Sequence, residues 1–242
     1  MLAERMNTFS GSPTSALIAK VAELRAEGKD IISLNVGEPD FGTPDYIKCG
    51  AIKAIVDNFS KYTAGNGIIE LRRLISKKLH EDNNLEYTTD EICATVGAKQ
   101  AIFNSIMALV DPGDEVLLPV PCWVSYTEMI KFAGAKPVFV DVEAETFDLD
   151  IEALEKAVTT KTKAIVICTP NNPTGAVYSE GTLRKLADLA CKYDFYIITD
   201  EIYEKLIYDE QNRLPEKKLQ TNYKYYYESR IGQIMNYLAL RL

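Results

Sequence analysis

Polar side chains that could form a binding site follow two apolar segments of the chain. Asn172 lies in a proline-rich loop directly after the apolar run 164–168, and Asp200 and Tyr203 follow the apolar run 195–199. In parallel sheets, ligands bind beyond the carboxyl ends of the strands, and these side chains stand at that edge. Each feature alone is as typical of a plain turn or a solvated strand end. Together they favour a binding site.

The two apolar runs are expected to be strands, because continuous apolar runs are typical of strands buried on both faces. Between them, Ser179 stands at a good helix start with Glu180 in the first turn. The helix has an apolar face at helical spacing, made of Leu183, Leu186, Ala187, Ala190 and Cys191. Strand, helix and strand imply a parallel sheet with a right-handed crossover, and such sheets bind ligands beyond the carboxyl ends of their strands.

The rest of the chain supplies further elements of an α/β fold. Apolar periodicity and turn residues predict helices over 14–27, 44–58, 71–79, 101–109 and 151–158, and strands over 31–35, 91–96, 115–119 and 135–142. We therefore predict an α/β protein built on a mostly parallel sheet.

Three turns add candidate site residues. Gly37 follows the predicted strand 31–35 and offers a backbone that a ligand can approach closely, or forms a plain turn. Gly97, Ala98 and Lys99 lie between a predicted strand and a helix, where free N–H groups and the positive helix end favour an anion. Trp123, the only tryptophan, follows a strand end and forms either core packing or the wall of a flat-ring site.

Composition excludes several function classes. The chain of 242 residues is 47% hydrophobic with a net charge of −8, which argues against nucleic acid or an anionic membrane as a partner. No apolar run approaches the roughly 20 residues of a membrane helix, and the N-terminus lacks the apolar core of a signal peptide. Five cysteines without a C-x-x-C pair and a single histidine, His80, favour a reduced cytoplasm and no metal site.

The motifs PNNPTG (170–175) and DEIY (200–203), in that order, resemble the paired motifs of class I aminotransferases. These are pyridoxal-phosphate enzymes of fold type I, similar to aspartate aminotransferase, and the resemblance extends over about residues 10–208. It implies a three-layer α/β large domain, a homodimer, and transfer of an amino group between an amino acid and a 2-oxo acid. It also implies an N-terminal segment over 1–43, a cofactor domain over 44–209 and a tail without resemblance over 210–242.

The resemblance also implies roles for single residues. Asp200 would pair with the ring nitrogen of the cofactor, and Trp123 would stack on the ring. Tyr203 and Asn172 would reach the phenolic oxygen of the ring. The phosphate would lie on the turn of Gly97, Ala98 and Lys99 and contact Tyr62 of the neighbouring subunit, while Gly37, Trp123 and Asn172 would contact the substrate.

The lysine that attaches the cofactor in this family has no match in the sequence. The position where it would fall is Asn222, and Lys217, Lys218 and Lys224 lie in a polar, tyrosine-rich stretch typical of solvated chain. We therefore assign no catalytic residue, expect the chain to be a C-terminally truncated and inactive family member, and interpret residues 210–242 as a frame change or early end.

Two alternatives to an inactive aminotransferase can be weighed. The first is a non-catalytic dimerising or interaction protein derived from an aminotransferase. The second is a nucleotide-binding α/β protein, suggested by the glycine pair at 65 and 67. The second is rejected because Glu70 replaces the third small residue of the dinucleotide motif, and no Walker loop is present.

Overall fold

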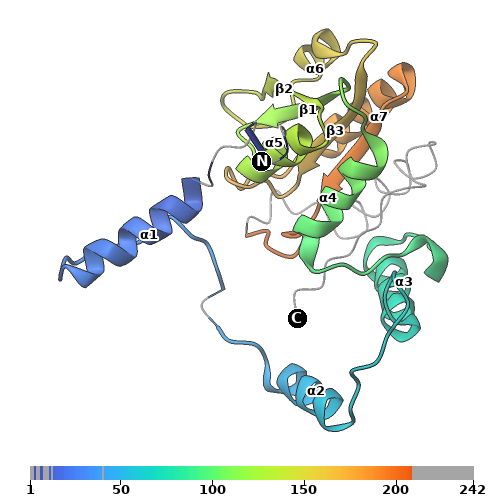
Figure 1. The fold of residues 1–242 in the computed structure, drawn as a ribbon. Helices are drawn as coiled ribbons and strands as arrows, with labels where there is room; N and C mark the ends of the chain where they lie inside the picture. The colour runs from blue at the N-terminus through green and yellow to red at the C-terminus, as the bar shows by residue number, and fades with distance from the viewer. Residues whose placement is uncertain (1–2, 4–5, 8–10, 12, 40, 209–242) are drawn as a thin grey trace. The chain divides into compact units, whose positions relative to one another are not determined.

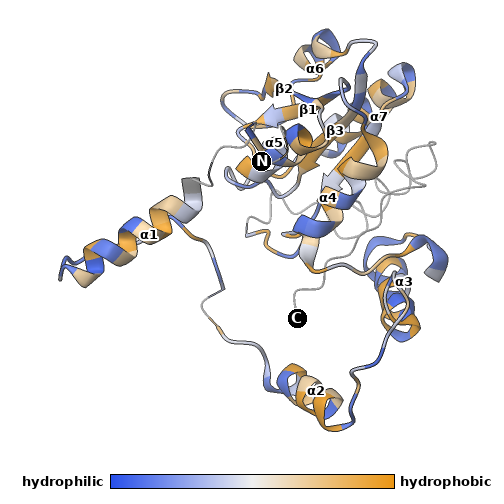
Figure 2. Cartoon of the chain, in the orientation of Figure 1, coloured by the Kyte–Doolittle hydropathy of each residue, from blue (hydrophilic) through white to orange (hydrophobic). Residues whose placement is uncertain are grey.

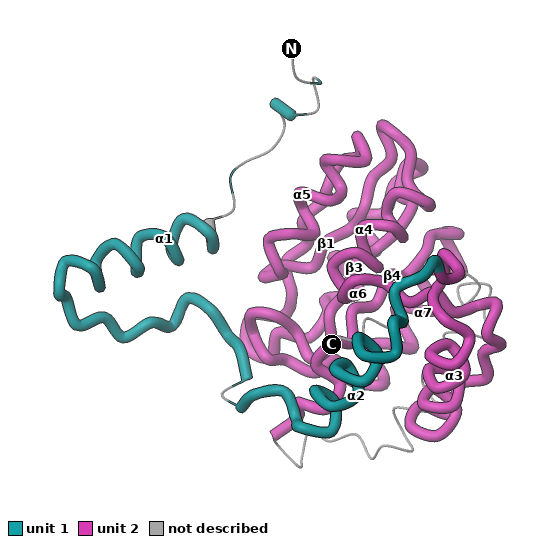
Figure 3. The backbone as a smooth tube through the Cα atoms, turned by 60° about the horizontal axis from the view of Figure 1, so that its bottom comes forward, with its two compact units in different colours: residues 1–62, 242 teal, residues 63–241 magenta. Residues whose placement is uncertain are grey.

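The computed structural model describes residues 3, 6–7, 11, 13–39 and 41–208. Two compact units are present, residues 1–62 and residues from 63 onward (Figure 3). The expectations for Asn222 and for the lysines at 217, 218 and 224 lie outside the described residues. The predicted domain boundaries after residues 43 and 209 stay predictions.

The second unit is built on a four-stranded sheet in the order β2-β1-β3-β4, in which every neighbouring pair is parallel (Figure 1). The strands are β1 (Glu115–Val120), β2 (Lys136–Asp141), β3 (Thr162–Cys168) and β4 (Tyr196–Asp200). The helices around them are α4 (Gly97–Leu109), α5 (Val124–Phe132), α6 (Ile151–Ala157) and α7 (Glu180–Tyr193). The predicted α/β class and its parallel sheet are confirmed.

Alternate residues of the strands enter two separate cores, one on each face of the sheet. Leu117, Ile165 and Ile197 pack with the apolar faces of α6 and α7. Val116 and Val166 point the other way and pack with α4 and α5. Successive strand side chains point to opposite faces, so continuous apolar runs are what a sheet covered on both sides requires. The result is three layers: helices, sheet, helices.

Helix α7 joins β3 to β4 and begins where the sequence predicted. The Ser179 hydroxyl accepts the Thr182 N–H at 3.1 Å and so caps the helix. The helix ends at Asp194, which is left-handed with φ 56°. The returning strand β4 then pairs with β3 so that Cys168 lies opposite Asp200. The loop after β3 and the end of β4 are therefore neighbours.

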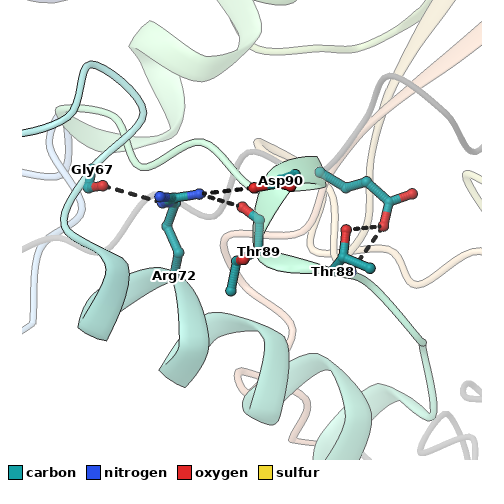
Figure 4. A network of polar contacts seen from close by, with 6 residues as sticks. Gly67, Arg72, Thr88, Thr89 and Asp90 are labelled. Atoms are coloured by element: carbon teal, nitrogen blue, oxygen red, sulfur yellow. Dashed lines mark hydrogen bonds and ion pairs between the residues drawn. The ribbon is translucent and has the colours of Figure 1, made fainter.

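Helix α3 (Ile69–Asn83) forms a third small core with the residues on either side of the short 3-10 helix η2 (Thr89–Glu91). Buried Arg72 ties them together: its Nε donates to the Gly67 carbonyl at 3.1 Å and its Nη1 to the Thr89 carbonyl at 2.6 Å (Figure 4). Asp90 lies 3.7 Å from the same guanidinium. One buried cation thus fixes the loop at Gly67 against η2.

The strand predicted over 91–96 is wrong. Residues 89–91 are η2, and 92–95 have no regular structure. Thr88 and Glu91 form a reciprocal capping box, with the Glu91 carboxylate accepting the Thr88 N–H at 2.8 Å, so this segment begins as a helical turn. The apolar pattern reflects burial of Ile92 in the small core and not a place in a sheet.

The first unit contains α1 (Pro13–Ala26) and α2 (Asp45–Val56), which confirms both predicted helices. Figure 2 shows hydrophobic and hydrophilic colours alternating along α1. The strand predicted over 31–35 is wrong: the segment is irregular, and Ile32 and Leu34 are 87% and 91% exposed. A strand needs a hydrogen-bonded neighbour, and the described residues pair none with this segment. Within the described ranges, no helix has the length and apolar character of a membrane span.

Candidate active site

The sheet changes direction between β1 and β3. From β1 the chain passes to β2 on one side, and then returns to β3 on the other side. In open parallel sheets the crevice beyond the carboxyl ends of two such strands is where ligands bind. The loops that follow β1 and β3 meet there, since the Asn171 side-chain N–H donates to the Pro121 carbonyl at 3.0 Å. Asn171 is buried, and its amide also reaches Thr174 Oγ1 at 3.0 Å, so it braces the loop.

Asp200, at the end of β4, is a buried carboxylate held in a fixed orientation. Only 7% of the residue is exposed. Its Oδ2 accepts the Tyr126 hydroxyl at 2.7 Å, and its Oδ1 accepts the Ile202 N–H at 3.2 Å. A carboxylate has about four lone-pair sites, so these two bonds orient the group and leave acceptor capacity for a ligand.

Tyr126 is the partner that fixes Asp200. It lies on α5 and is 1% exposed. Burial, together with the negative charge of Asp200, raises the pKa of its phenol far above the ordinary value, so the hydroxyl stays a donor. The same surroundings act on Cys168, where burial and the Asp200 charge raise the thiol pKa to about 11. Both the phenol and the thiol near Asp200 thus stay protonated, and the Tyr126 hydroxyl donates directly to the acid.

Trp123 forms an aromatic wall next to this acid. Its ring meets the Tyr126 ring edge-on, with centroids 5.2 Å apart. On α4, the Lys99 Nζ lies over the Trp123 ring, 4.8 Å from the centroid. The first turn of α4 therefore lies beside the tryptophan that follows β1.

The first turn of α4 leaves backbone donors for an anion. Gly97 opens the helix with φ +82°, a conformation that L side chains rarely adopt. The Val96 N–H is already bound by the Gln100 side chain at 2.7 Å, and the Gly97 N–H by the Thr95 carbonyl at 2.9 Å. The N–H groups of the next two residues, Ala98 and Lys99, precede the first intrahelical bonds. They are the donors available to an anion.

The loop after β3 meets the turn after β4 through two predicted residues. The Asn172 side-chain N–H donates to the Tyr203 hydroxyl at 3.4 Å, and both residues are half-buried. The turn that carries Tyr203 is anchored from α3, because Lys78 Nζ lies 2.5 Å from Glu204 Oε1 and Asn83 donates to Glu204 Oε2 at 3.3 Å. Asn172 and Tyr203 are thus held on a braced segment beside Asp200.

Four of the predicted site residues lie in two pairs, and one neighbouring residue was not predicted. Lys99 and Trp123 lie together, and so do Asn172 and Tyr203, as paired neighbours in the second unit. Gly37 and Tyr62 belong to the first unit, where both are exposed. Tyr126 was not among the predicted site residues, whereas Asn171 was predicted, with Asn172, to lie at this edge of the sheet. Tyr126 stands three residues after Trp123, a spacing that shares a helix face, and this signal could have suggested that both serve one site.

At the switch point of a parallel sheet, a fixed buried acid, an aromatic wall and a helix N-terminus stand together. This arrangement defines a doubly wound α/β protein with a candidate ligand site beyond the carboxyl ends of its strands.

Comparison with known proteins gives the family. The chain belongs to the class I and II aminotransferase family, whose model matches residues 29–226.

Individual relatives support this assignment. Aspartate/prephenate aminotransferase of Thermus thermophilus is 46% identical over 217 residues, which cover 88% of this chain and 56% of the relative. Aspartate aminotransferase of Bacillus subtilis is 44% identical over 208 residues, or 86% of this chain and 53% of the relative. The chain spans about half the length of these curated relatives.

Solved structures agree with the fold. The structure of aspartate aminotransferase from Thermus thermophilus with maleate matches with a TM-score of 0.84 at 37% identity, covering 97% of this chain and 70% of that one. Aspartate aminotransferase from Rhizobium meliloti also gives a TM-score of 0.84 at 37% identity, covering 92% of this chain and 56% of that one. The three-layer α/β architecture is therefore that of the aminotransferase fold.

Proposed function

We propose that this chain forms the cofactor-binding part of a pyridoxal-phosphate-dependent aminotransferase. The observation that carries the proposal is the Tyr126–Asp200 hydrogen bond of 2.7 Å, which holds a buried carboxylate at the carboxyl edge of the sheet. A buried carboxylate with a free lone pair stabilises a protonated ring nitrogen by ion pairing. When bound, pyridoxal phosphate supplies the electron sink that amino-group transfer requires.

The other residues of the site fit the same group. Trp123 offers a flat apolar wall for the ring, and Asn172 and Tyr203 offer donors to the phenolic oxygen of the ring. The backbone N–H groups of Ala98 and Lys99, at the positive end of α4, suit a phosphate. Each chemical part of the cofactor therefore has a matching residue type, and all of these residues lie in one unit.

Substrate, assembly and location follow as proposals from the family. Amino acid and 2-oxo acid would bind through Gly37, Trp123 and Asn172, and a homodimer would bring Tyr62 of one subunit to the phosphate of the other. The cysteines are all free, which supports a reduced cytoplasm. We also propose residues 1–43 and 44–209 as the N-terminal segment and the cofactor domain, and 210–242 as a separate tail.

We propose further that this chain alone does not turn over amino acids, because the family's lysine motif has no match in it. Without that amine, proton transfer at the substrate lacks its acid–base group. The test is to incubate the purified chain with pyridoxal phosphate, aspartate and 2-oxoglutarate and to measure glutamate formation. No glutamate above the level of free cofactor supports the proposal, and sustained turnover would refute it.

A non-catalytic interaction protein is the second candidate, and α2 favours it. This helix has no buried residue, and its apolar side chains Ile52, Ile55 and Val56 are between 60% and 77% exposed. Exposed apolar surface of this kind marks interaction sites. Co-expression with a full-length homologue followed by pull-down tests it: a stable mixed complex that an Ile55→Asp variant abolishes supports this role, and no complex rejects it.

A further inference from the structure

We propose that Lys99 is the amine that attaches pyridoxal phosphate covalently to this chain. The inference rests on the proposed function, because it requires the cofactor ring to stack on Trp123. It goes beyond that function, which uses only the backbone N–H of Lys99 for the phosphate.

The position of the amine carries the inference. The Lys99 Nζ lies 4.8 Å from the centroid of the Trp123 ring. A ring stacked on an aromatic wall lies about 4.5–7 Å from it, centroid to centroid. A cofactor ring that stacks on this face of Trp123 takes the place of the Lys99 amine, which then moves to the edge of the ring.

The orientation of the cofactor agrees with this position. In pyridoxal phosphate the aldehyde and the phosphate arm stand on adjacent ring carbons. The phosphate site is the first turn of α4, and Lys99 belongs to that turn. Helix side chains lean toward the N-terminus, so the Lys99 side chain extends toward the end that holds the phosphate. An aldehyde next to the phosphate arm would meet this amine.

The bond-forming step balances without a further reactant. The neutral Lys99 amine adds to the aldehyde carbon, the C–N bond forms, and the aldehyde oxygen leaves as water, which gives an imine. Borohydride then delivers a hydride to the imine carbon, and water supplies the proton to nitrogen. The product is a stable secondary amine between Lys99 and the phosphopyridoxyl group.

The experiment is borohydride reduction of the full chain after equilibration with pyridoxal phosphate, followed by peptide mapping. The control is Lys163, whose Nζ also lies over an aromatic ring, 5.9 Å from the Tyr196 centroid, but on β3 and away from α4. We expect half-labelling of Lys99 at a concentration at least about tenfold below that for Lys163, because the stacked ring raises the effective concentration of the aldehyde. Lys99→Arg should remove the label, and Lys163→Arg should leave it unchanged.

Two further arms separate the possible failures. Trp123→Ala, which removes the aromatic wall, or pyridoxal without its phosphate, should reduce the Lys99 label to the level of Lys163. The inference would be overturned if Lys99 in these arms is labelled as strongly as in the natural chain with pyridoxal phosphate, or if the label is on a lysine of residues 210–242. 4-Deoxypyridoxine phosphate lacks the aldehyde, so its saturable effect on Trp123 emission reports ring binding alone. If this effect is present and Lys99 stays unlabelled, only the attachment is wrong. If it is absent, the proposed cofactor site fails too.

Discussion

Replacing Tyr126 by Phe removes one hydroxyl from the centre of the site and keeps the shape of the side chain. The hydroxyl donates to Asp200 Oδ2 at 2.7 Å, and both residues are buried, 1% and 7% exposed. A hydrogen bond to a charged group contributes about 1.5–3 kcal/mol, and here the carboxylate oxygen would lose its partner out of reach of water. We expect the free energy of unfolding to fall by about that amount, which is on the order of ten- to a hundredfold in the folding equilibrium.

The assay is urea unfolding at neutral pH, with Tyr178→Phe as the matched control. Tyr178 is also buried, 2% exposed, but it bonds to Thr169 Oγ1 through its backbone N–H, which phenylalanine retains. The midpoint should drop clearly more for Tyr126→Phe, with an unchanged slope. Equal losses in the two variants would refute the reasoning, because the loss would then reflect removal of any buried phenol.

The remaining predictions concern three residues outside the ligand-facing part of the site, Arg72, Ser179 and Cys168. Arg72→Ala should destabilise the chain by about 1.5–3 kcal/mol in urea unfolding, since it leaves two carbonyls unpaired, whereas exposed Arg73→Ala should change little. Ser179→Ala should cost about 1 kcal/mol by loss of the α7 cap, and Ser179→Asp should restore it; equal stability of all three would contradict this. The raised pKa of Cys168, from 9.0 to about 11, keeps the thiol neutral in the folded state. The neutral thiol therefore stabilises the folded state fully below pH 9.0, and this contribution is lost as the pH rises through about 11. In urea unfolding at a series of pH values, Cys168→Ala should remove this part of the fall in the free energy of unfolding.

The central strands and α7 could be predicted because local sequence decides them. The run that became β3 is apolar throughout, and a strand between two helical layers needs that pattern. Ser179 supplied a cap whose hydrogen bond lies within one turn. The placement of Asp200 and Asn172 at one edge of the sheet could also be predicted, since parallel strands bring their carboxyl ends to one edge.

Other features could not be predicted because they depend on distant partners. Residues 31–35 and 91–96 have apolar patterns typical of strands, but neither has a paired neighbour in the described structure. The Tyr126–Asp200 bond joins residues 74 positions apart, and only the packing of α5 over the sheet brings them together. A tyrosine in an apolar helix face carries no local sign that its hydroxyl has such a partner.

The most direct test of the proposed cofactor site is a titration with pyridoxal phosphate that follows the emission of Trp123, the only tryptophan in the chain. The titration compares the natural sequence with Asp200→Ala and with Asp141→Ala. Asp141 also ends a strand at this edge, but it is exposed and lies on β2, at the opposite side of the sheet from β4. We expect saturable quenching in the natural chain and in Asp141→Ala. In Asp200→Ala the affinity for pyridoxal phosphate should be at least about tenfold weaker, because the substitution removes one buried charge pair. Quenching that does not saturate, or that is the same in all three proteins, would contradict the assignment of this edge as the cofactor site.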